Sequence, residues 1–353
     1  MEIFNATELE GSLYQVNDAN FTFPERAPWE IILDKANTVI MVMNSITLML
    51  GMGAAIYLKE ILSHVKRPVG AAIGMLGQFI VLPATGYGLS VMFSLKPYEA
   101  LGVLMISCSP GGSFSNFFTY WCDGDLALSV MMTTCSSIMA FGGMPFNLWL
   151  YSGHWLVEGD DAIVVPFLSI TKSLTFVMGP VIVGMIIRHF HEKAASMITK
   201  IASIIGWVGC VVGSTFWLIL YWDVFVMASP FVYATAVLLP LTGFLLAYTL
   251  AKLLCQNHQV CRTIGIETGS QNMPVAASVI LLSFHDPWIR AQILMFPTLY
   301  GVMLLSEVFV GISSFQLYKR HCAKGREDLL LHPMTHTAKI EPGTRAEKAS
   351  LAV

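Results

Sequence analysis

Long apolar stretches alternate with short polar connections along most of this chain. Each stretch holds about 17–25 residues, the length that an α-helix needs to cross a lipid bilayer. The pattern predicts nine membrane-spanning helices, and hence an all-α polytopic membrane protein. Their expected bounds are 36–58, 69–93, 98–120, 126–151, 163–187, 198–221, 228–252, 263–284 and 288–317.

Two of the predicted spans are interrupted at mid-length by polar, glycine and proline residues. One interruption runs from Ser107 to Asn116 and the other from Glu267 to Pro274. Irregular backbone at membrane depth is tolerated only where it is buried in protein or lines a wet cavity. An unpaired acid at that depth costs about 2.5–3.5 kcal/mol on insertion scales. Glu267, with side-chain oxygens and freed carbonyls around it, therefore predicts a cation site.

The spans that precede the two interruptions share a short sequence. Leu-Pro-x-Thr-Gly occurs at Leu82 to Gly86 and again at Leu239 to Gly243. On the predicted topology the two spans run in opposite directions, so spans two to four and seven to nine form inverted repeats. Inverted repeats with paired interrupted helices are typical of secondary transporters that bind their substrate near the membrane midplane.

Composition agrees with a membrane protein. The chain is 55% hydrophobic and 12% charged, with a mean hydropathy of +0.65, whereas a soluble domain carries about 25% charged residues. The seven cysteines show no metal-binding spacing. We expect a surrounding lipid bilayer, no nucleic-acid partner, and no cofactor other than a coupling ion.

The distribution of basic residues predicts which loops and which terminus lie on the cytoplasmic side of the membrane. Lysine and arginine gather in the loops after spans one, five and seven and in the tail, which we therefore expect to be cytoplasmic. The polar segment 1–35 carries glycosylation sequons at Asn5 and Asn20 and is expected to be extracellular. Segment 318–353 is expected to be a flexible cytoplasmic tail. The predicted location is the plasma membrane.

Several polar side chains lie within the apolar spans. Ser129 and Thr133 are four residues apart and so share one helix face. Hydroxyl, amide and carboxylate oxygens suit a hard cation such as sodium, although serine and threonine in such helices more often bond to a backbone carbonyl. For Glu307, contact with a neighbouring helix or a place near the inner interface is the more ordinary interpretation. The other candidates are Gln78, Ser115, Asn116 and Gln271.

At these residues the sequence resembles the sodium/bile acid cotransporter family over about residues 36–320. The motifs that carry the resemblance are Cys108 to Gly112, Ser115-Asn116, Asp123-Gly-Asp125, Leu128-Ser129, Met132 to Ser136, Cys261 to Thr263, Glu267 to Asn272, and Phe296-Pro297 with Tyr300.

The resemblance implies sodium-coupled symport by alternating access, with a bile salt or steroid sulfate as substrate. It implies a core domain (69–151 and 228–317) and a panel domain (36–58 and 163–221). One implied sodium site consists of Ser115, Asn116, Ser129, Thr133 and Glu267. The other consists of Gln78, Glu267, Ser270 and Gln271.

Two residues depart from the family pattern. Pro274 stands where relatives commonly have glutamine, although proline suits the first turn of a helix. Lys172 stands in an apolar span, where a lysine either marks a pathway, snorkels or pairs with an acid. With Asn272, these residues are candidates for the substrate pathway.

The sequence argues against two other classes of function. A seven-helix receptor conflicts with the loop charges. An intramembrane enzyme would need paired acids at depth, but Asp123 and Asp125 are expected to cap the start of the fourth span. We therefore expect no enzymatic activity. The remaining alternative is an orphan member of the same fold that binds a ligand without transporting it.

Overall fold

The chain is helical throughout the part that the computed structural model describes, apart from short connections. That part comprises residues 27–57, 69–112, 114–155 and 165–331, with side chains up to residue 321. The predicted glycosylation sites Asn5 and Asn20 lie outside it. The helices are α2 (Pro28–Ala55), α4 (Val69–Leu76), the π-helical turn η2 (Gly77–Val81), α5 (Leu82–Met92), α6 (Pro97–Ser107), α7 (Ser115–Trp121), α8 (Leu126–Ser152), the 3-10 turn η3 (Gly153–Trp155), α9 (Phe167–Phe190), α10 (Glu192–Leu220), α11 (Trp222–Val226), α12 (Pro230–Leu253), α13 (His258–Gly269), α14 (Met273–Ser283) and α15 (Pro287–Leu331).

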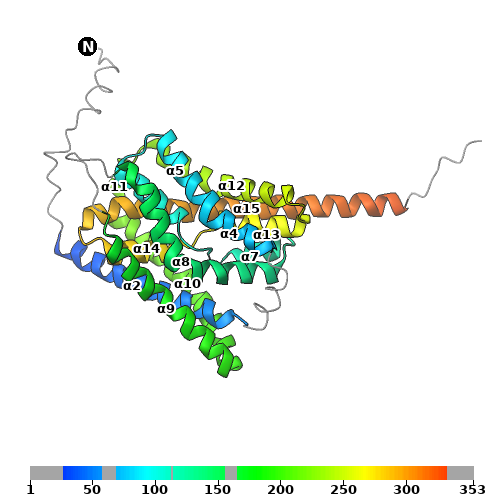
Figure 1. Ribbon diagram of the computed structural model, residues 1–353, viewed down its shortest axis with the longest axis horizontal. Coiled ribbons are helices and arrows are strands. Elements are labelled where there is room, and N and C mark those ends of the chain that lie inside the picture. Colours follow the sequence, from blue (N-terminus) through cyan, green and yellow to red (C-terminus); the bar gives the residue numbers. More distant parts are fainter. Residues whose placement is uncertain (1–26, 58–68, 113, 156–164, 332–353) are drawn as a thin grey trace, which may run out of the picture.

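Seven helical segments among the described residues are long and apolar enough to cross a membrane. They form one bundle around the break regions (Figure 1), which confirms an all-α polytopic membrane protein. The two predicted spans with interruptions are each divided into two short helices, α6 with α7 and α13 with α14. The seven segments are Pro28–Ala55, Val69–Met92, Leu126–Trp155, Phe167–Phe190, Glu192–Leu220, Pro230–Leu253 and Pro287–His321.

Several helices extend further than their apolar cores predict. Helix α2 begins at Pro28, inside the segment expected to be an extracellular extension, because Pro28 suits the first turn and Glu30 accepts a hydrogen bond from the Ala27 N–H at 3.2 Å. Helix α15 continues to Leu331 and projects beyond the bundle in Figure 1. No proline interrupts residues 298–331, so the first part of the expected tail is helical.

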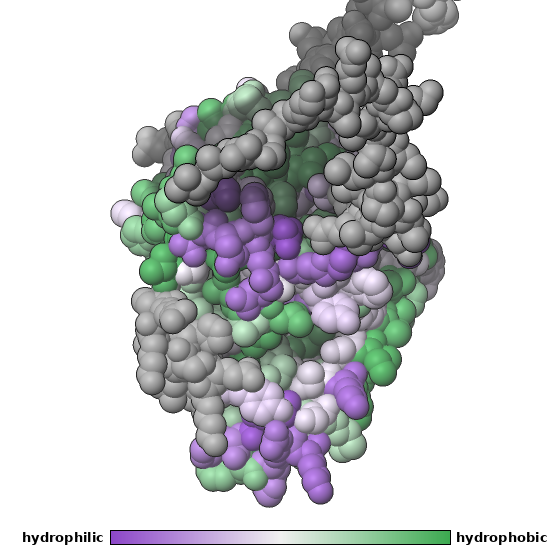
Figure 2. Space-filling model, turned by 90° about the vertical axis from the view of Figure 1, so that its right-hand side faces the viewer, coloured by the Kyte–Doolittle hydropathy of each residue, from purple (hydrophilic) through white to green (hydrophobic). Residues whose placement is uncertain are grey.

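The surface of the bundle changes character between its sides and its ends. Large apolar side chains stand outward along the sides: Ile204 on α10 is 68% exposed and Phe309 on α15 is 74% exposed. Hydrophilic residues gather on the end from which α15 projects (Figure 2). Apolar sides and a polar end are what a bilayer requires of a protein that crosses it.

Candidate ion and substrate site

The two interrupted helix pairs meet at their breaks. The N–H of Gly112 donates to the carbonyl of Ser270 at 2.8 Å, and the N–H of Asn272 donates to the carbonyl of Pro110 at 2.9 Å. A side chain on Gly112 would place its Cβ 2.8 Å from the carbonyl oxygen of Gln271, so this close approach requires glycine. The backbone groups that the breaks release are thus paired with one another, which makes irregular backbone tolerable at this depth.

The turn before α8 fixes the helix that faces the crossing. Asp125 caps α8 by accepting a hydrogen bond from the Leu128 N–H at 3.0 Å, as predicted. The prediction is wrong for Asp123, which has a φ of 49° and pairs with Lys319 at 2.7 Å instead. Positive φ places Asp123 in a tight turn, which directs its carboxylate toward α15 and away from the start of α8.

Glu267 lies at the centre of a ring of hydroxyl groups and is 1% exposed. The Ser115 hydroxyl donates to its Oε1 at 2.6 Å and the Thr133 hydroxyl to its Oε2 at 2.9 Å. The Ser129 hydroxyl also contacts Oε1, and it lies 2.8 Å from Oδ1 of Asn116. The structure therefore brings together all five residues of the first predicted site, from α7, α8 and α13.

The second predicted group gathers beside the first. The side-chain amide of Gln78 on η2 lies 2.9 Å from Oε1 of Gln271. The Ser109 hydroxyl lies 3.3 Å from the same oxygen. Gly111 lies between the two groups: a Cβ there would be 3.2 Å from Oε2 of Glu267 and 3.8 Å from Nε2 of Gln78. Glycine at this position keeps the space between the two groups free of a side chain.

The chemistry of these groups fits a hard monovalent cation. These residues offer carboxylate, hydroxyl, amide and backbone carbonyl oxygens, which is the set that hard cations prefer. Among the described residues there is no group of three or more His, Cys, Asp or Glu side chains that would suit a transition metal. Glu267 has no basic partner in its hydrogen bonds or ion pairs within that part of the chain. A bound cation would therefore compensate a buried negative charge.

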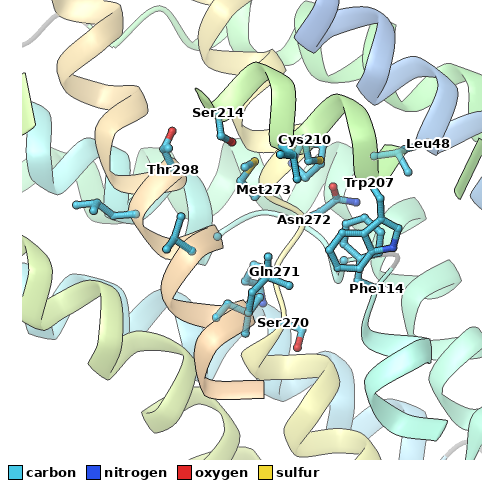
Figure 3. Close-up of a pocket in the computed structure, with 18 of the residues that line it drawn as sticks. Leu48, Phe114, Trp207, Cys210, Ser214, Ser270, Gln271, Asn272, Met273 and Thr298 are labelled. Carbon is cyan, nitrogen blue, oxygen red and sulfur yellow. The ribbon is translucent and has the colours of Figure 1, made fainter. Parts of the chain in front are cut away.

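Next to the crossing lies a cavity of about 420 Å³, which we call the main cavity. Helix α10 forms one wall, and Figure 3 shows Trp207, Cys210 and Ser214 of that helix facing Asn272 and Met273. Most of the lining is apolar. Its full set of residues is Leu48, Gly112, Phe114, Ser115, Phe118, Trp207, Cys210, Val211, Ser214, Thr215, Leu218, Phe225, Ser270, Gln271, Asn272, Met273, Pro274, Thr298, Leu299, Gly301, Val302, Leu304 and Leu305.

The start of α14 gives this cavity its polar features. Asn272 caps the helix by accepting from the Val275 N–H at 3.2 Å, while its Nδ2 is buried with no hydrogen-bond partner. Pro274 stands in the first turn, as expected, and its carbonyl accepts a hydrogen bond from Ser45 of α2 at 2.6 Å. Lys172 stands apart, because its side chain is exposed on α9 and does not line the cavity.

Sequence reasoning missed several residues that support the site. The Tyr300 hydroxyl accepts a hydrogen bond from the Gln271 N–H and donates to the Gly269 carbonyl, which holds the end of α13. The Ser136 hydroxyl accepts from the Gly111 N–H at 3.1 Å. Tyr300 belonged to a recognised motif without a role. Ser109 and Ser136 likewise lie within motifs that carry the family resemblance, which gave them no role. Ser45 carried no signal that separated it from other hydroxyl residues in apolar spans.

Sequence comparisons agree with this geometry. The profile described as the Sodium Bile acid symporter family matches residues 42–228. The ileal sodium/bile acid cotransporter of Oryctolagus cuniculus is 33% identical over 338 residues, covering 96% of this chain and 93% of the relative. The Homo sapiens protein of the same name is 33% identical over 346 residues, covering 98% and 95%.

A second kind of relative matches as well. The sodium-dependent organic anion transporter of Homo sapiens is 34% identical over 317 residues, covering 88% of this chain and 81% of the relative. These similarities extend over nearly the whole chain and include both interrupted helix pairs. The chain therefore belongs to the sodium bile acid symporter family, whose members are transporters and not enzymes.

Proposed function

We propose that this protein imports amphipathic organic anions, bile salts or sulfated steroids, together with sodium by alternating access. The observation that carries the proposal is the Glu267 carboxylate, buried at the crossing of two broken helix pairs and surrounded by hydroxyl oxygens from α7 and α8. A buried acid in this setting needs a cation to neutralise it. The names of the relatives, which specify sodium dependence, support sodium as that cation.

Coupling follows from residues that belong to both sites. Ser115, Ser270 and Gln271 line the main cavity, and all three belong to the proposed sodium sites. Sodium bound at Glu267 would draw α7, α8 and α13 together, and so would set the shape of the cavity wall. Substrate would therefore bind best after sodium, which is the differential affinity that coupling requires.

The main cavity suits an amphipathic anion. Its wall is largely apolar, and the unpartnered Nδ2 of Asn272 supplies a hydrogen-bond donor for a polar head group. With two sodium ions per monovalent anion, each cycle would move one net positive charge inward. A membrane potential then contributes about 2.3 kcal/mol per 100 mV for that charge.

We also propose how the chain is arranged in the plasma membrane. The seven continuous spans, with the pairs α6–α7 and α13–α14, would make nine crossings. Helices α2, α9 and α10, which pack on one another, would form the panel domain, and the two inverted triplets would form the core. The amino terminus, with sequons at Asn5 and Asn20, would be extracellular.

Uptake in expressing cells tests the function directly. Labelled taurocholate and estrone sulfate are offered in sodium buffer and in choline buffer, to cells with wild-type protein or Glu267→Gln. We expect sodium-dependent uptake of at least one anion, and its loss in the variant. Uptake that is equal in the two buffers would refute coupling. Absence of uptake at normal surface expression would favour a ligand-binding protein that does not transport.

A further inference from the structure

A second cavity, of about 360 Å³, lies on another side of the helix that carries Glu267. Helices α7, α12, α13 and α15 line it, and we call it the Glu307 cavity after its one acid. It shares Phe118, Ser270 and Leu304 with the main cavity, so these residues form the wall between the two. The residues of the proposed sodium sites other than Ser270 do not line it.

The carboxylate of Glu307 has no positively charged partner in this cavity. Its Oε1 is buried without a hydrogen-bond partner, and its carboxylate has no ion pair among the described residues. The helix contact expected from the sequence does not supply a partner for that oxygen. A carboxylate surrounded by apolar side chains is costly unless a cation lies beside it.

The one basic side chain of the lining, Arg262, contacts groups other than this acid. The Nη2 of Arg262 donates to the Asp123 carbonyl at 2.8 Å, and its guanidinium lies 5.3 Å from the ring centre of Phe315. Phe315 is eight residues beyond Glu307 on α15, or about 12 Å along the helix axis. The positive charge of Arg262 therefore lies toward Phe315, without an ion pair to Glu307, and leaves Glu307 uncompensated.

The lining also selects the kind of cation. A small hard ion requires several oxygen ligands, and this cavity offers one carboxylate in a largely apolar wall. Phe118, Phe244 and Phe315 line it, and aromatic faces attract organic ammonium ions. We propose that the Glu307 cavity binds a lipophilic ammonium ion, with the charged nitrogen at Glu307 and the apolar body along α12 and α15.

Arg262 adds one more requirement for the ligand. Nε of Arg262 is buried without a hydrogen-bond partner. A ligand whose far end carries a hydrogen-bond acceptor would satisfy this donor while its ammonium group contacts Glu307. The site therefore fits an amphipathic amine with an ether or carbonyl oxygen at the end opposite its charge, a class of compound distinct from the anions proposed for the main cavity.

Binding of a matched pair of compounds tests the site without any measurement of transport. The purified full-length protein in neutral detergent is titrated with 4-phenylbutyltrimethylammonium and with its neutral analogue, in which carbon replaces the charged nitrogen. Calorimetry in sodium-free buffer reports the affinity. We expect saturable binding of the cation, at least tenfold tighter than binding of the neutral analogue, which corresponds to about 1.4 kcal/mol.

Three variants identify the place of binding. Glu307→Gln should lower the affinity for the cation at least tenfold and leave the affinity for the neutral analogue unchanged. Ile312→Trp, which fills the cavity, should abolish binding of both compounds. Ser306→Ala, at the exposed neighbouring position, is the control and should change neither. Equal affinity of the wild-type protein for the two compounds would overturn the proposal. So would cation binding of unchanged affinity in each of the single variants Glu307→Gln and Ile312→Trp.

Discussion

Asp34 on α2 and Arg290 on α15 form an ion pair at 2.5 Å, and Tyr221, at the end of α10, donates to the same carboxylate at 2.7 Å. The side chains of Arg290 and Asp34 are only 11% and 13% exposed. We expect Asp34→Asn to lower the free energy of unfolding by about 3 kcal/mol, because it leaves a largely buried guanidinium without its counter-charge. Thermal unfolding of the purified protein measures this loss.

The pair between Lys319 and Asp123 is the matched control. These side chains are 56% and 45% exposed, so solvent screens their attraction. Lys319→Gln should cost about 0–1 kcal/mol. If the two substitutions destabilise the protein equally, burial does not strengthen the Asp34 pair.

Sodium should stabilise the folded protein through Glu267. A ligand present at a hundred times its dissociation constant stabilises the state that binds it by about 2.7 kcal/mol. We expect a higher unfolding temperature in sodium chloride than in choline chloride for the wild-type protein, and no such difference for Glu267→Gln. Glu307→Gln removes the acid of the Glu307 cavity and should keep the full sodium effect. A sodium effect that persists in Glu267→Gln would place the ion elsewhere.

Gly112→Ala tests the contact between the two breaks. The added methyl group would lie 2.8 Å from the Gln271 carbonyl oxygen and 3.2 Å from that of Ser270, so the backbone must move apart. We expect a loss of about 1–3 kcal/mol in stability, together with loss of sodium-dependent uptake. Gly142→Ala on α8 meets nothing within 4 Å and should be neutral or slightly stabilising, with unchanged uptake. Normal uptake by Gly112→Ala would show that the two breaks need not pair during transport.

Asn272→Asp separates helix capping from substrate binding. Aspartate caps a helix as well as asparagine does, so stability should change little. The substitution removes the free Nδ2 donor from the main cavity and adds a negative charge, which repels an anion. We expect KM for the transported anion to rise about tenfold. Asn257→Asp, at the corresponding cap of α13, keeps its contact with the Val260 N–H and should leave KM unchanged. An equal rise of KM in both variants would contradict the role of Asn272 in substrate binding.

The sequence predicted the helical spans and the location of both breaks because these depend on local composition. A run of apolar residues indicates a membrane span whichever helices pack against it. Glycine and proline indicate a break in a helix in the same way, independently of the helices around it. The Glu267 group could be predicted for a related reason. A buried acid needs polar partners, and the family resemblance indicated which of the polar side chains in these spans they are.

Contacts between distant helices could not be predicted in the same way. Nothing local distinguishes Ser45, which bonds to Pro274, from Thr47, which bonds to its own helix. The missing partner of Glu307 is likewise a property of the packed bundle. Helix ends were also missed, because Pro28 and the polar continuation of α15 extend helices beyond their apolar cores.

The π-helical turn at Gly77–Val81 sets the rotation of α4 relative to α5 within one span. Gln78 is 1% exposed and points to the crossing, while Ile80 is 56% exposed and points outward. A π turn accommodates one residue more than an α-helical turn does. Loss of one residue here would turn α4 by about 100° relative to α5, and would carry Gln78 away from Gln271. A single-residue deletion, with every proposed ion ligand still in the chain, would thus disrupt the second proposed sodium site.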